Sequence, residues 1–348
     1  LGHRRGGVAM AAVGACAGFG AICGSSLATA ATMGRVALPE LRRMGYSGSL
    51  STGALAAGGT LGILIPPSVI LIIYSILTEQ NIAKMFLAAF VPGILAAIGY
   101  LIAIAIFVRI KPDSGPPTSY VGWRQRLNLF GQVWQILVIF FLVIGGIYLG
   151  WFTPTEGASI GAAGTGIMAL FTKGFNFSDL IDVIKDTAVT SAMIFLVLLG
   201  AEFFNSFIAL TQITNELATF VISNELSPYL VVFCILVLYI LLGCLMDSLA
   251  MILLTIPVFF PIIIELDFGM SIEEVAIWFG ILTLIVVEVG LITPPVGLNV
   301  FIINKMAKNV PISDTFIGVL PFLISDLIRV GILFIFPGIS LFLIRLFG

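Results

Sequence analysis

The sequence predicts an all-α polytopic membrane protein built on an inverted-topology repeat, each copy with a re-entrant hairpin and a broken transmembrane helix. Three observations predict this fold class. Hydrophobic residues make up 59% of the 348 residues and charged residues only 10%, whereas soluble domains are about 25% charged. Two long apolar segments each contain a Pro-Pro pair near their middle. Finally, two related regions carry flanking charges of opposite sign.

The two interrupted segments are residues 59–77 and residues 289–303. Residues 59–77 contain no charge and are long enough to cross a bilayer. Glycine stands four residues before each Pro-Pro pair, at Gly62 and Gly290. Proline removes a backbone donor, and a carbonyl freed in hydrocarbon has no water to bond, so such breaks are tolerated only in a cavity or inside protein. One Pro-Pro pair could merely kink a packing helix, but two in related positions favour a functional site.

The hairpins are predicted from an internal repeat. Residues 25–47 resemble residues 247–271: Ser-Leu-Ala begins at Ser26 in one and at Ser248 in the other, and a proline follows thirteen residues later in both. The apolar run 229–264 is too long for one span of about 20 residues, so it is predicted to be a hairpin of two arms. A hairpin followed by a broken helix therefore occurs twice.

Charges around the hairpins indicate that the two copies point in opposite directions. Basic residues flank the first hairpin: Arg4, Arg5, Arg35, Arg42 and Arg43. Acidic residues, without Lys or Arg, flank the second: Glu216, Glu225, Glu265, Asp267, Glu273 and Glu274. After the broken helices the bias reverses, with Glu79 and Lys84 in the first copy and Lys305 and Lys308 in the second. The positive-inside rule then places residues 109–126 and the entry of the first copy in the cytoplasm, and an inverted repeat is typical of secondary transporters.

The rest of the composition excludes several function classes. Sixteen basic residues do not make a nucleic-acid surface, and no nucleotide-binding motif occurs. The four cysteines lie in apolar runs without CxxC spacing, which suggests packing and neither a disulfide framework nor a metal site. The single histidine, His3, cannot form a zinc site or a proton relay alone. Because the chain begins at Leu1 without a signal peptide, an N-terminal part is expected to be missing.

The breaks predict a site for a cation. Discontinuous helices at the bilayer midplane expose carbonyl groups that coordinate ions such as sodium, and the glycines would permit backbone angles that a Cβ resists. Intramembrane acids are costly and often functional, and Asp247 stands at the second hairpin tip where the first copy has Ser25. Glu202 and Glu288 are either functional or buried, hydrogen-bonded structural acids, and the sequence leaves both interpretations open.

Two other classes of protein fit the sequence less well. A membrane-embedded enzyme would need a nucleophile–base pair or metal ligands, and the only histidine lies outside the apolar runs. A channel would need a continuous pore, for which paired inverted breaks are not expected. The pattern therefore favours a transporter that is not an enzyme and uses no organic cofactor.

Several stretches resemble the large membrane subunit of tripartite ATP-independent periplasmic (TRAP) transporters of the ion transporter superfamily. They are ICGSSLATAATMGRVALPELRRMGYS, GGTLGILIPPSVILIIYSIL, WFTPTEGAS and GLITPPVGLNVFIINKM, and the similarity covers essentially the whole chain. The resemblance implies an elevator-type, sodium-coupled importer of a small organic anion, a carboxylate or a sulfonate, in the bacterial inner membrane. It implies two protein partners, a small four-helix membrane subunit and a periplasmic binding protein that delivers the anion. A sodium-coupled carrier of the same superfamily that works without a binding protein is the alternative.

The resemblance also implies site residues. The first sodium site would use carbonyl groups of Gly20, Cys23, Gly62, Ile65 and Pro67. The second would use Gly243, Gly290, Thr293 and Val296, with the Thr293 hydroxyl able to contribute. Substrate would meet the hairpin tips at Ser25, Ser26, Thr29, Asp247 and Ser248. Cys23 and Thr29 depart from the serine and aspartate that sialic-acid-type members have there, which leaves dicarboxylates, keto acids, hydroxy acids and sulfonates open.

The predicted organisation divides the chain into a transport domain and surrounding helices. The transport domain would comprise residues 1–84 and 229–304, each with one hairpin and one broken helix. One scaffold or arm helix would follow each of these parts, in residues 85–110 and 305–348. The connecting region would comprise a cytoplasmic linker, residues 111–128, and scaffold helices with connectors, residues 129–228.

Overall fold

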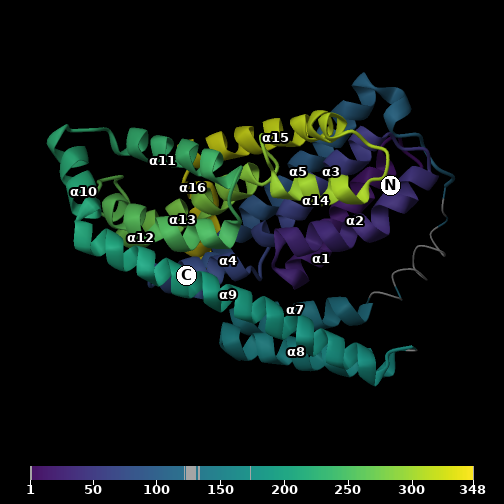
Figure 1. The fold of residues 1–348 in the computed structure, drawn as a ribbon, viewed down its shortest axis with the longest axis horizontal. Coiled ribbons are helices and arrows are strands. Elements are labelled where there is room, and N and C mark those ends of the chain that lie inside the picture. The colour runs from purple at the N-terminus through teal and green to yellow at the C-terminus, as the bar shows by residue number, and fades with distance from the viewer. Residues whose placement is uncertain (1, 121, 123–130, 132–133, 173, 348) are drawn as a thin grey trace. The chain divides into compact units, whose positions relative to one another are not determined.

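The computed structural model describes residues 2–120, 122, 131, 134–172 and 174–347, and these form helices and loops without a strand. The chain divides into two compact units (Figure 1). Unit 1 comprises Leu1–Tyr120 and Phe207–Gly348, and unit 2 comprises Val121–Ser206. Both hairpins and both Pro-Pro breaks lie in unit 1, which therefore holds every site residue predicted from the sequence.

The first copy of the predicted repeat begins with two helices joined by a two-residue tip. Helix α1 (Gly7–Cys23) ends where Gly24 adopts a left-handed conformation, with φ of 64°, and its N–H donates to the Gly20 carbonyl at 2.7 Å. Helix α2 (Ser26–Arg43) follows at once, with Ser25 as its N-cap. Glycine is favoured at such a helix end because it has no Cβ to resist a positive φ.

The broken helix of the first copy follows directly. Helix α3 (Gly48–Leu64) ends before the Pro66-Pro67 bond, which is cis. Helix α4 (Val69–Leu77) then leaves at an angle of 44° to α3. The break predicted from the two prolines is confirmed.

The second half of unit 1 shows the same succession of elements. Residues 229–264 form two helices, as predicted, and a third and a fourth helix flank a cis Pro294-Pro295 bond. These helices are α11 (Pro228–Gly243), α12 (Ser248–Ile264), α13 (Ile272–Gly290) and α14 (Leu298–Met306). Helix α10 (Ile213–Ser223) precedes them and packs on α12.

Short polar side chains set the starts of these helices. In five cases the N-cap side chain accepts a hydrogen bond from a backbone N–H in the first turn, the arrangement that Ser and Asp favour. The capping residues are Ser25, Ser47, Ser68, Asp247 and Ser271. The serine and aspartate at the hairpin tips are therefore fixed in place by the helices that they begin.

A long helix follows each broken helix. Helix α5 (Ile82–Ile110) follows the first, and α15 (Ile312–Ile335) follows the second. The region 305–348, expected to hold one arm helix, holds two, because α16 (Gly338–Phe347) begins anew after Pro337. Proline has no N–H to continue the helical ladder, and it restricts the residue before it.

A buried polar network joins α3, α5 and α15. The Tyr100 hydroxyl donates to the Asp326 carboxylate at 2.7 Å and lies 2.8 Å from the Thr60 hydroxyl oxygen. Arg329 donates to the other Asp326 oxygen at 2.8 Å, and both members of this ion pair are buried. The ion pair lies within α15, and the Tyr100 contacts connect this helix to α5 and α3.

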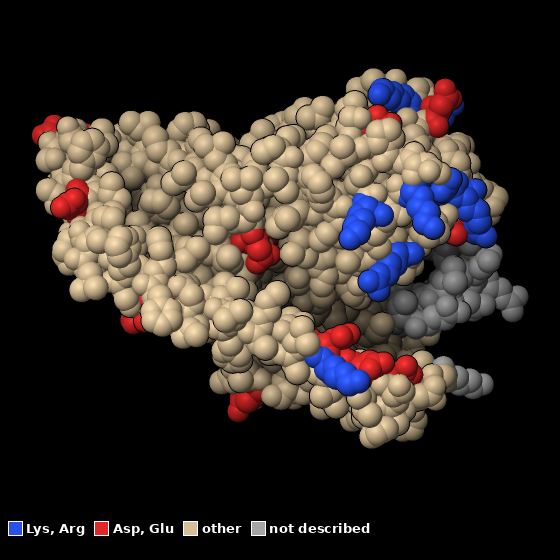
Figure 2. Space-filling view, in the orientation of Figure 1, with Lys and Arg blue, Asp and Glu red and all other residues tan. Residues whose placement is uncertain are grey.

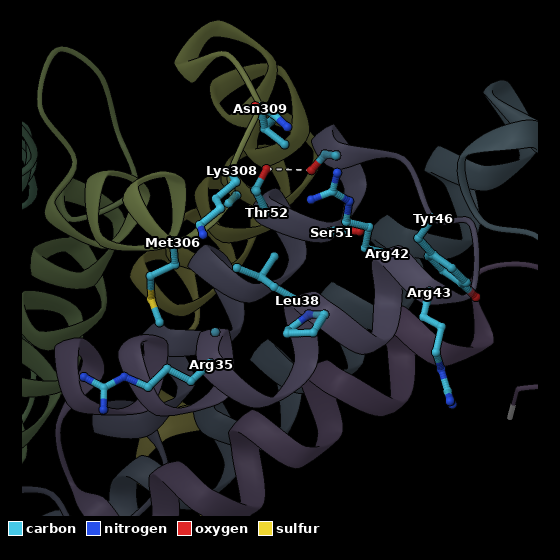
Figure 3. Close-up of a pocket in the computed structure, with 15 residues that line it drawn as sticks. Arg35, Leu38, Arg42, Arg43, Tyr46, Ser51, Thr52, Met306, Lys308 and Asn309 are labelled. Atoms are coloured by element: carbon cyan, nitrogen blue, oxygen red, sulfur yellow. Dashed lines mark hydrogen bonds between the residues drawn. The ribbon is translucent and has the colours of Figure 1, made fainter.

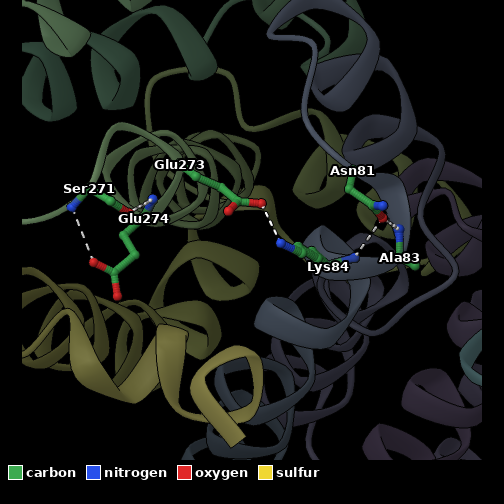
Figure 4. Close-up of polar contacts among 6 residues, drawn as sticks. All are labelled: Asn81, Ala83, Lys84, Ser271, Glu273 and Glu274. Atoms are coloured by element: carbon green, nitrogen blue, oxygen red, sulfur yellow. Dashed lines mark hydrogen bonds and ion pairs between the residues drawn. The ribbon is translucent and has the colours of Figure 1, made fainter. Parts of the chain in front are cut away.

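Exposed ion pairs tie the start of α13 to two other helix ends. Lys84 in the first turn of α5 pairs with Glu273 at 2.7 Å (Figure 4), and Arg345 of α16 pairs with Glu274 at 2.8 Å. Ser271 and Glu274 also form a reciprocal capping box at this helix start. Exposed ion pairs of this kind contribute only about 0–1 kcal/mol each to the stability of a fold. They therefore show which helix ends lie together but stabilise the fold little.

Several helices are suited to a membrane. Helices α5, α9 (Phe177–Thr211) and α15 are each long and apolar enough to cross one, and the bent pair of α3 and α4 would make a fourth span. Unit 2 comprises α7 (Trp134–Tyr148), α8 (Pro154–Phe171) and most of α9. The linker predicted at residues 111–128 lies partly outside the described residues.

Candidate functional site

Each hairpin meets its broken helix at a pair of glycines. A Cβ at Gly20 of α1 would overlap the Gly62 backbone of α3, and a Cβ at Gly62 would lie 2.5 Å from the Thr29 hydroxyl oxygen. In the second half, a Cβ at Gly290 of α13 would lie 2.5 Å from the Gly243 Cα atom of α11. We call these contacts junction 1 and junction 2.

The glycines serve close packing, which corrects the reason expected from the sequence. Gly20, Gly62, Gly243 and Gly290 all lie within helices and do not have positive φ angles. Glycine is needed there because another helix backbone occupies the space of a Cβ, and not because of an unusual backbone angle.

The spacing from glycine to proline has a direct chemical consequence. In a continuous helix the N–H of each residue bonds the carbonyl four residues earlier. Pro66 and Pro294 have no N–H, so neither can donate to the carbonyl of the glycine four residues before it. At junction 2 the Gly290 carbonyl accepts only a short-range bond from the Thr293 N–H, at 3.0 Å.

Both tips also touch the Pro-Pro loops. At junction 1, a Cβ added to Gly24 would lie 3.2 Å from the Pro67 carbonyl oxygen, so the hairpin tip lies against the break. At junction 2, the Gly297 N–H donates to the Cys244 carbonyl and the Cys244 thiol donates to the Pro294 carbonyl, each at 3.2 Å. The backbone of each tip therefore lies against its break.

The other predicted cation ligands lie at the same two junctions. Cys23 is the last residue of α1, Ile65 ends α3 with extended backbone, and Pro67 lies in the first break. Thr293 and Val296 lie in the second break, between α13 and α14. The structure thus places at each junction the residues that the resemblance implied for it.

The predicted substrate residues occupy the starts of α2 and α12. Ser25 and Asp247 are the N-caps, and their side chains accept bonds from the Ala28 and Leu249 N–H groups. Ser26, Thr29 and Ser248 are buried one turn or less beyond the tips. The hydroxyl groups of Ser26 and Thr29 have no hydrogen-bond partner among the described residues.

Glu288 of α13 connects the two tips. It is 1% exposed, and its carboxyl group lies beside the side chains of Ser26 and Ser248, near Asp247. Neither of its oxygens has a hydrogen-bond partner in the described part of the chain. The Ser26 and Ser248 side chains still interact with this carboxyl group, so the structure is consistent with both interpretations, a functional acid and a structural one. Glu202, the other acid left open, is exposed on α9.

Asn299 is a site residue that the sequence reasoning missed. It is fully buried in the first turn of α14, its Oδ1 has no partner among the described residues, and its Nδ2 donates to the Ala56 carbonyl of α3 at 3.4 Å. A Cβ at Gly59 would lie 3.2 Å both from the Ser26 carbonyl oxygen and from Asn299 Nδ2. An amide directly after a Pro-Pro break in an apolar helix was the available signal.

The groups at this site fit a small hard cation and an anion. Its unpartnered buried atoms are all oxygens, from hydroxyl, amide and carboxylate groups, and such oxygens with freed carbonyls are suited to sodium. Within the described residues no cluster of three His, Cys, Asp or Glu side chains could hold a metal ion. The N-termini of α2 and α12 point their N–H groups toward the tips, where they favour negative charge.

An all-helical apolar chain with broken helices in its core defines a multi-pass membrane protein. The chain belongs to the family described as the DctM component of tripartite ATP-independent periplasmic transporters, whose sequence model matches residues 1–339. The resemblance noted in the sequence is therefore confirmed.

Proteins similar to this chain are named for several substrates. It is 34% identical over 342 residues to the C4-dicarboxylate TRAP transporter large permease protein DctM of Pseudomonas aeruginosa, covering 98% of this chain and 78% of that protein. It is 31% identical over 344 residues to the sialic acid TRAP transporter permease protein SiaT of Haemophilus influenzae, covering 98% of this chain and 54% of that protein. The ectoine permease TeaC of Halomonas elongata is 30% identical over 345 residues, which are 99% of this chain and 78% of that protein.

Proposed function

We propose that this chain is the permease of a sodium-driven importer of a small organic anion in the bacterial inner membrane. A periplasmic binding protein delivers the anion, and a small four-helix membrane subunit braces the permease. The family description as tripartite and periplasmic supports both partners. The hairpins and broken helices form the part that moves in an elevator-type cycle.

The observation that carries the proposal is the pair of matching junctions. Each brings a hairpin end onto a helix whose carbonyl ladder is cut by a Pro-Pro pair, which is how secondary transporters build ion sites. The first sodium site comprises Gly20, Cys23, Gly62, Ile65 and Pro67, and the second comprises Gly243, Gly290, Thr293 and Val296. Sodium would supply positive charge that balances the buried oxygens and the incoming anion.

The way helix ends meet supports an inverted repeat. The start of α3 lies by the end of α14, since a Cβ at Gly48 would be 2.7 Å from the Val310 side chain. At the opposite ends of these elements, Lys84 after α4 pairs with Glu273 at the start of α13. Both contacts are those expected if equivalent elements run in opposite directions, and they support the orientation that the flanking charges predict.

The substrate lies between the hairpin tips, facing Ser25, Ser26 and Thr29 from one side and Asp247 and Ser248 from the other. Two helix N-termini attract its negative charge. The relatives are named for C4-dicarboxylate, sialic acid and ectoine, so the fold accepts several small polar molecules. Cys23 and Thr29 favour a ligand other than sialic acid.

The test is uptake by the complete complex in liposomes with its binding protein under an imposed sodium gradient. We expect uptake that depends on sodium and not on ATP. Uptake that is equally fast with potassium in place of sodium would contradict the proposal. A matched preparation without the binding protein separates the alternative, a carrier that works alone, because only that carrier would still import.

A further inference from the structure

A basic pocket lies away from the hairpin tips, between α2, the start of α3 and the turn that follows α14. Its volume is about 750 Å³, within the range of small-molecule sites. Figure 3 shows α2 on one side, with Arg35, Leu38 and Arg42, and the turn with Lys308 on the other. We call this cavity the basic pocket.

The pocket carries an uncompensated positive charge. Four basic residues line it, Arg35, Arg42, Arg43 and Lys308, and no acidic residue does. Arg43 pairs with Glu40, but in the described part of the chain no ion pair neutralises the other three. Figure 2 shows basic side chains gathered over the region where Figure 1 places α2 and the end of α14.

A buried hydroxyl group in the pocket also lacks a partner. Ser51 lines the pocket, is only 4% exposed, and its Oγ makes no hydrogen bond to any described residue. Its neighbour Thr52 differs, because the Thr52 hydroxyl donates to the Gly48 carbonyl at 2.8 Å. A buried hydroxyl left unpaired costs free energy unless a ligand or water bonds to it, so Ser51 is a second, independent sign of an occupant.

The pocket is lined by the far ends of two helices that begin near the proposed substrate site. Helix α2 begins at Ser26 beside the tips and reaches the pocket at Arg35, about 13 Å further along at 1.5 Å per residue. Helix α14 begins after the second break and ends in the pocket at Met306. A Cβ at Gly34 would lie 3.1 Å from the Met306 sulfur, so the two helices are in close contact there.

We propose that the basic pocket binds anionic groups, carboxylate, sulfonate or phosphate, and that the transported organic anion occupies it after leaving the hairpin tips. This assignment of the occupant rests on the proposed transport function. The three unpaired basic residues supply the attraction, and the Ser51 hydroxyl supplies a hydrogen bond that fixes the anion. Because these basic groups lie on the side that the positive-inside rule makes cytoplasmic, the pocket is the last position of the anion before release.

The test measures the electrostatic character of the pocket with two thiol reagents. A single cysteine replaces the exposed Asn309 at the pocket edge in a chain lacking Cys16, Cys23, Cys234 and Cys244, assembled with its small subunit in phosphatidylcholine nanodiscs. An anionic methanethiosulfonate should react at least about tenfold faster than a cationic one at low salt, since nearby charges act oppositely on the two reagents. Salt should remove most of the difference.

Two variants show whether the pocket itself is responsible. Arg35→Gln together with Lys308→Gln should bring the two rates within about twofold of each other, because these exposed side chains supply the charge. Lys305→Gln removes an exposed lysine near the end of α14 that does not line the pocket, and should leave the ratio unchanged. Equal rates for both reagents in the parent, or a ratio untouched by the double variant, would overturn the anion site.

Succinate and lipid identify the occupant. Millimolar succinate should slow modification in phosphatidylcholine nanodiscs for the parent and not for the double variant. If modification is slower in phosphatidylglycerol nanodiscs and succinate has no effect on its rate, the occupant is a lipid headgroup. That result would overturn the transported anion as occupant. Labelling needs no transport, so a failure here with sodium-driven uptake intact rejects only the pocket. The reverse result rejects the transport proposal, and with it the transported anion as occupant, but leaves the anion site in place.

Discussion

The Thr293 hydroxyl is the only side-chain oxygen among the proposed sodium ligands. It donates to the Val289 carbonyl at 2.6 Å, which leaves its lone pairs free for a cation. Thr293→Val keeps the shape and removes the oxygen, at a cost of roughly 1–3 kcal/mol if nothing replaces it. We expect the sodium concentration for half-maximal uptake to rise about tenfold, the equivalent of about 1.4 kcal/mol. The measurement is initial uptake against sodium concentration.

Thr165→Val is the matched control, because the Thr165 hydroxyl donates to the Gly161 carbonyl four residues earlier in α8, as Thr293 does to Val289. Its sodium dependence should equal that of the parent. An unchanged sodium dependence in Thr293→Val would remove this threonine from the site.

The buried carboxyl group of Glu288 gives a second prediction at the scale of single residues. Burying a carboxylate among apolar helices is costly, and acids inside a membrane are often functional, so we expect Glu288 to serve transport. Glu288→Gln removes the charge and keeps the size. Uptake should fall by at least about tenfold, the equivalent of about 1.4 kcal/mol, while the melting temperature stays equal or rises.

Glu202→Gln, on the exposed surface of α9, should change neither quantity. A lower melting temperature for Glu288→Gln with normal uptake would show that the acid is structural. Asn299 also shows what sequence reasoning misses at this scale, since the Ala56 carbonyl that it contacts lies 243 residues away. Gly62 and Gly290 could be singled out because each stands four residues before a Pro-Pro pair, whereas the helix backbones that pack against them lie more than 40 residues away.

At the scale of elements, the junctions depend on how closely two helices approach. Gly290→Ala would put a methyl group 2.5 Å from the Gly243 Cα atom, and overpacking of this kind costs about 1–3 kcal/mol. We expect lower stability in chemical unfolding together with weaker uptake. Gly200→Ala is the control, because a Cβ at this helical glycine of α9 has no described atom within 4 Å. Equal stability of the two variants would contradict the close approach of α11 and α13.

The link between α5 and α15 gives a second prediction for elements. Asp326→Asn leaves the Arg329 charge buried without its carboxylate, and removing one partner of a buried pair costs roughly 3–5 kcal/mol. The unfolding free energy of the purified protein should fall by about that amount. Asp314→Asn, exposed in the first turn of the same helix, should have little effect, and a similar loss for both would show that the pair is not responsible.

The elements themselves could be predicted from the sequence where local chemistry decides them. Both hairpins, both breaks and the start of α12 follow from glycine, proline and capping residues. The division of residues 305–348 into α15 and α16 was not foreseen, although Pro337 was visible. The hydrogen bond between Tyr100 and Asp326 joins residues 226 positions apart, and no local sequence pattern predicts such a pair.

At the scale of the whole molecule, the long helix of unit 2 carries many exposed apolar side chains. In α9 only 6% of the most apolar window is buried within this chain, and large apolar side chains such as Phe195, Leu196 and Phe203 are exposed. Lipid or the small membrane subunit would cover such a surface. Hydropathy predicts the helices of this unit, and their exposed apolar side chains are suited to contact with lipid.

The whole-molecule prediction concerns orientation, on which both proposals depend. Single cysteines replace Arg43 at the end of α2 and Glu265 at the end of α12, both exposed. Ser47 and Ser271 are less suitable because they cap α3 and α13, and losing a cap costs about 1 kcal/mol. The basic flanks of the first hairpin and the acidic flanks of the second predict that these two positions lie on opposite sides of the membrane.

The measurement is labelling with an impermeant maleimide. In inside-out vesicles it should label only the cysteine at position 43, and in right-side-out cells only the cysteine at position 265. In permeabilised membranes it should label both. The cysteine-free chain gives the background. If both positions are labelled from one side, the repeat is not inverted, the basic pocket loses its place at the cytoplasmic end, and the two junctions cannot be equivalent halves of one ion-coupled site.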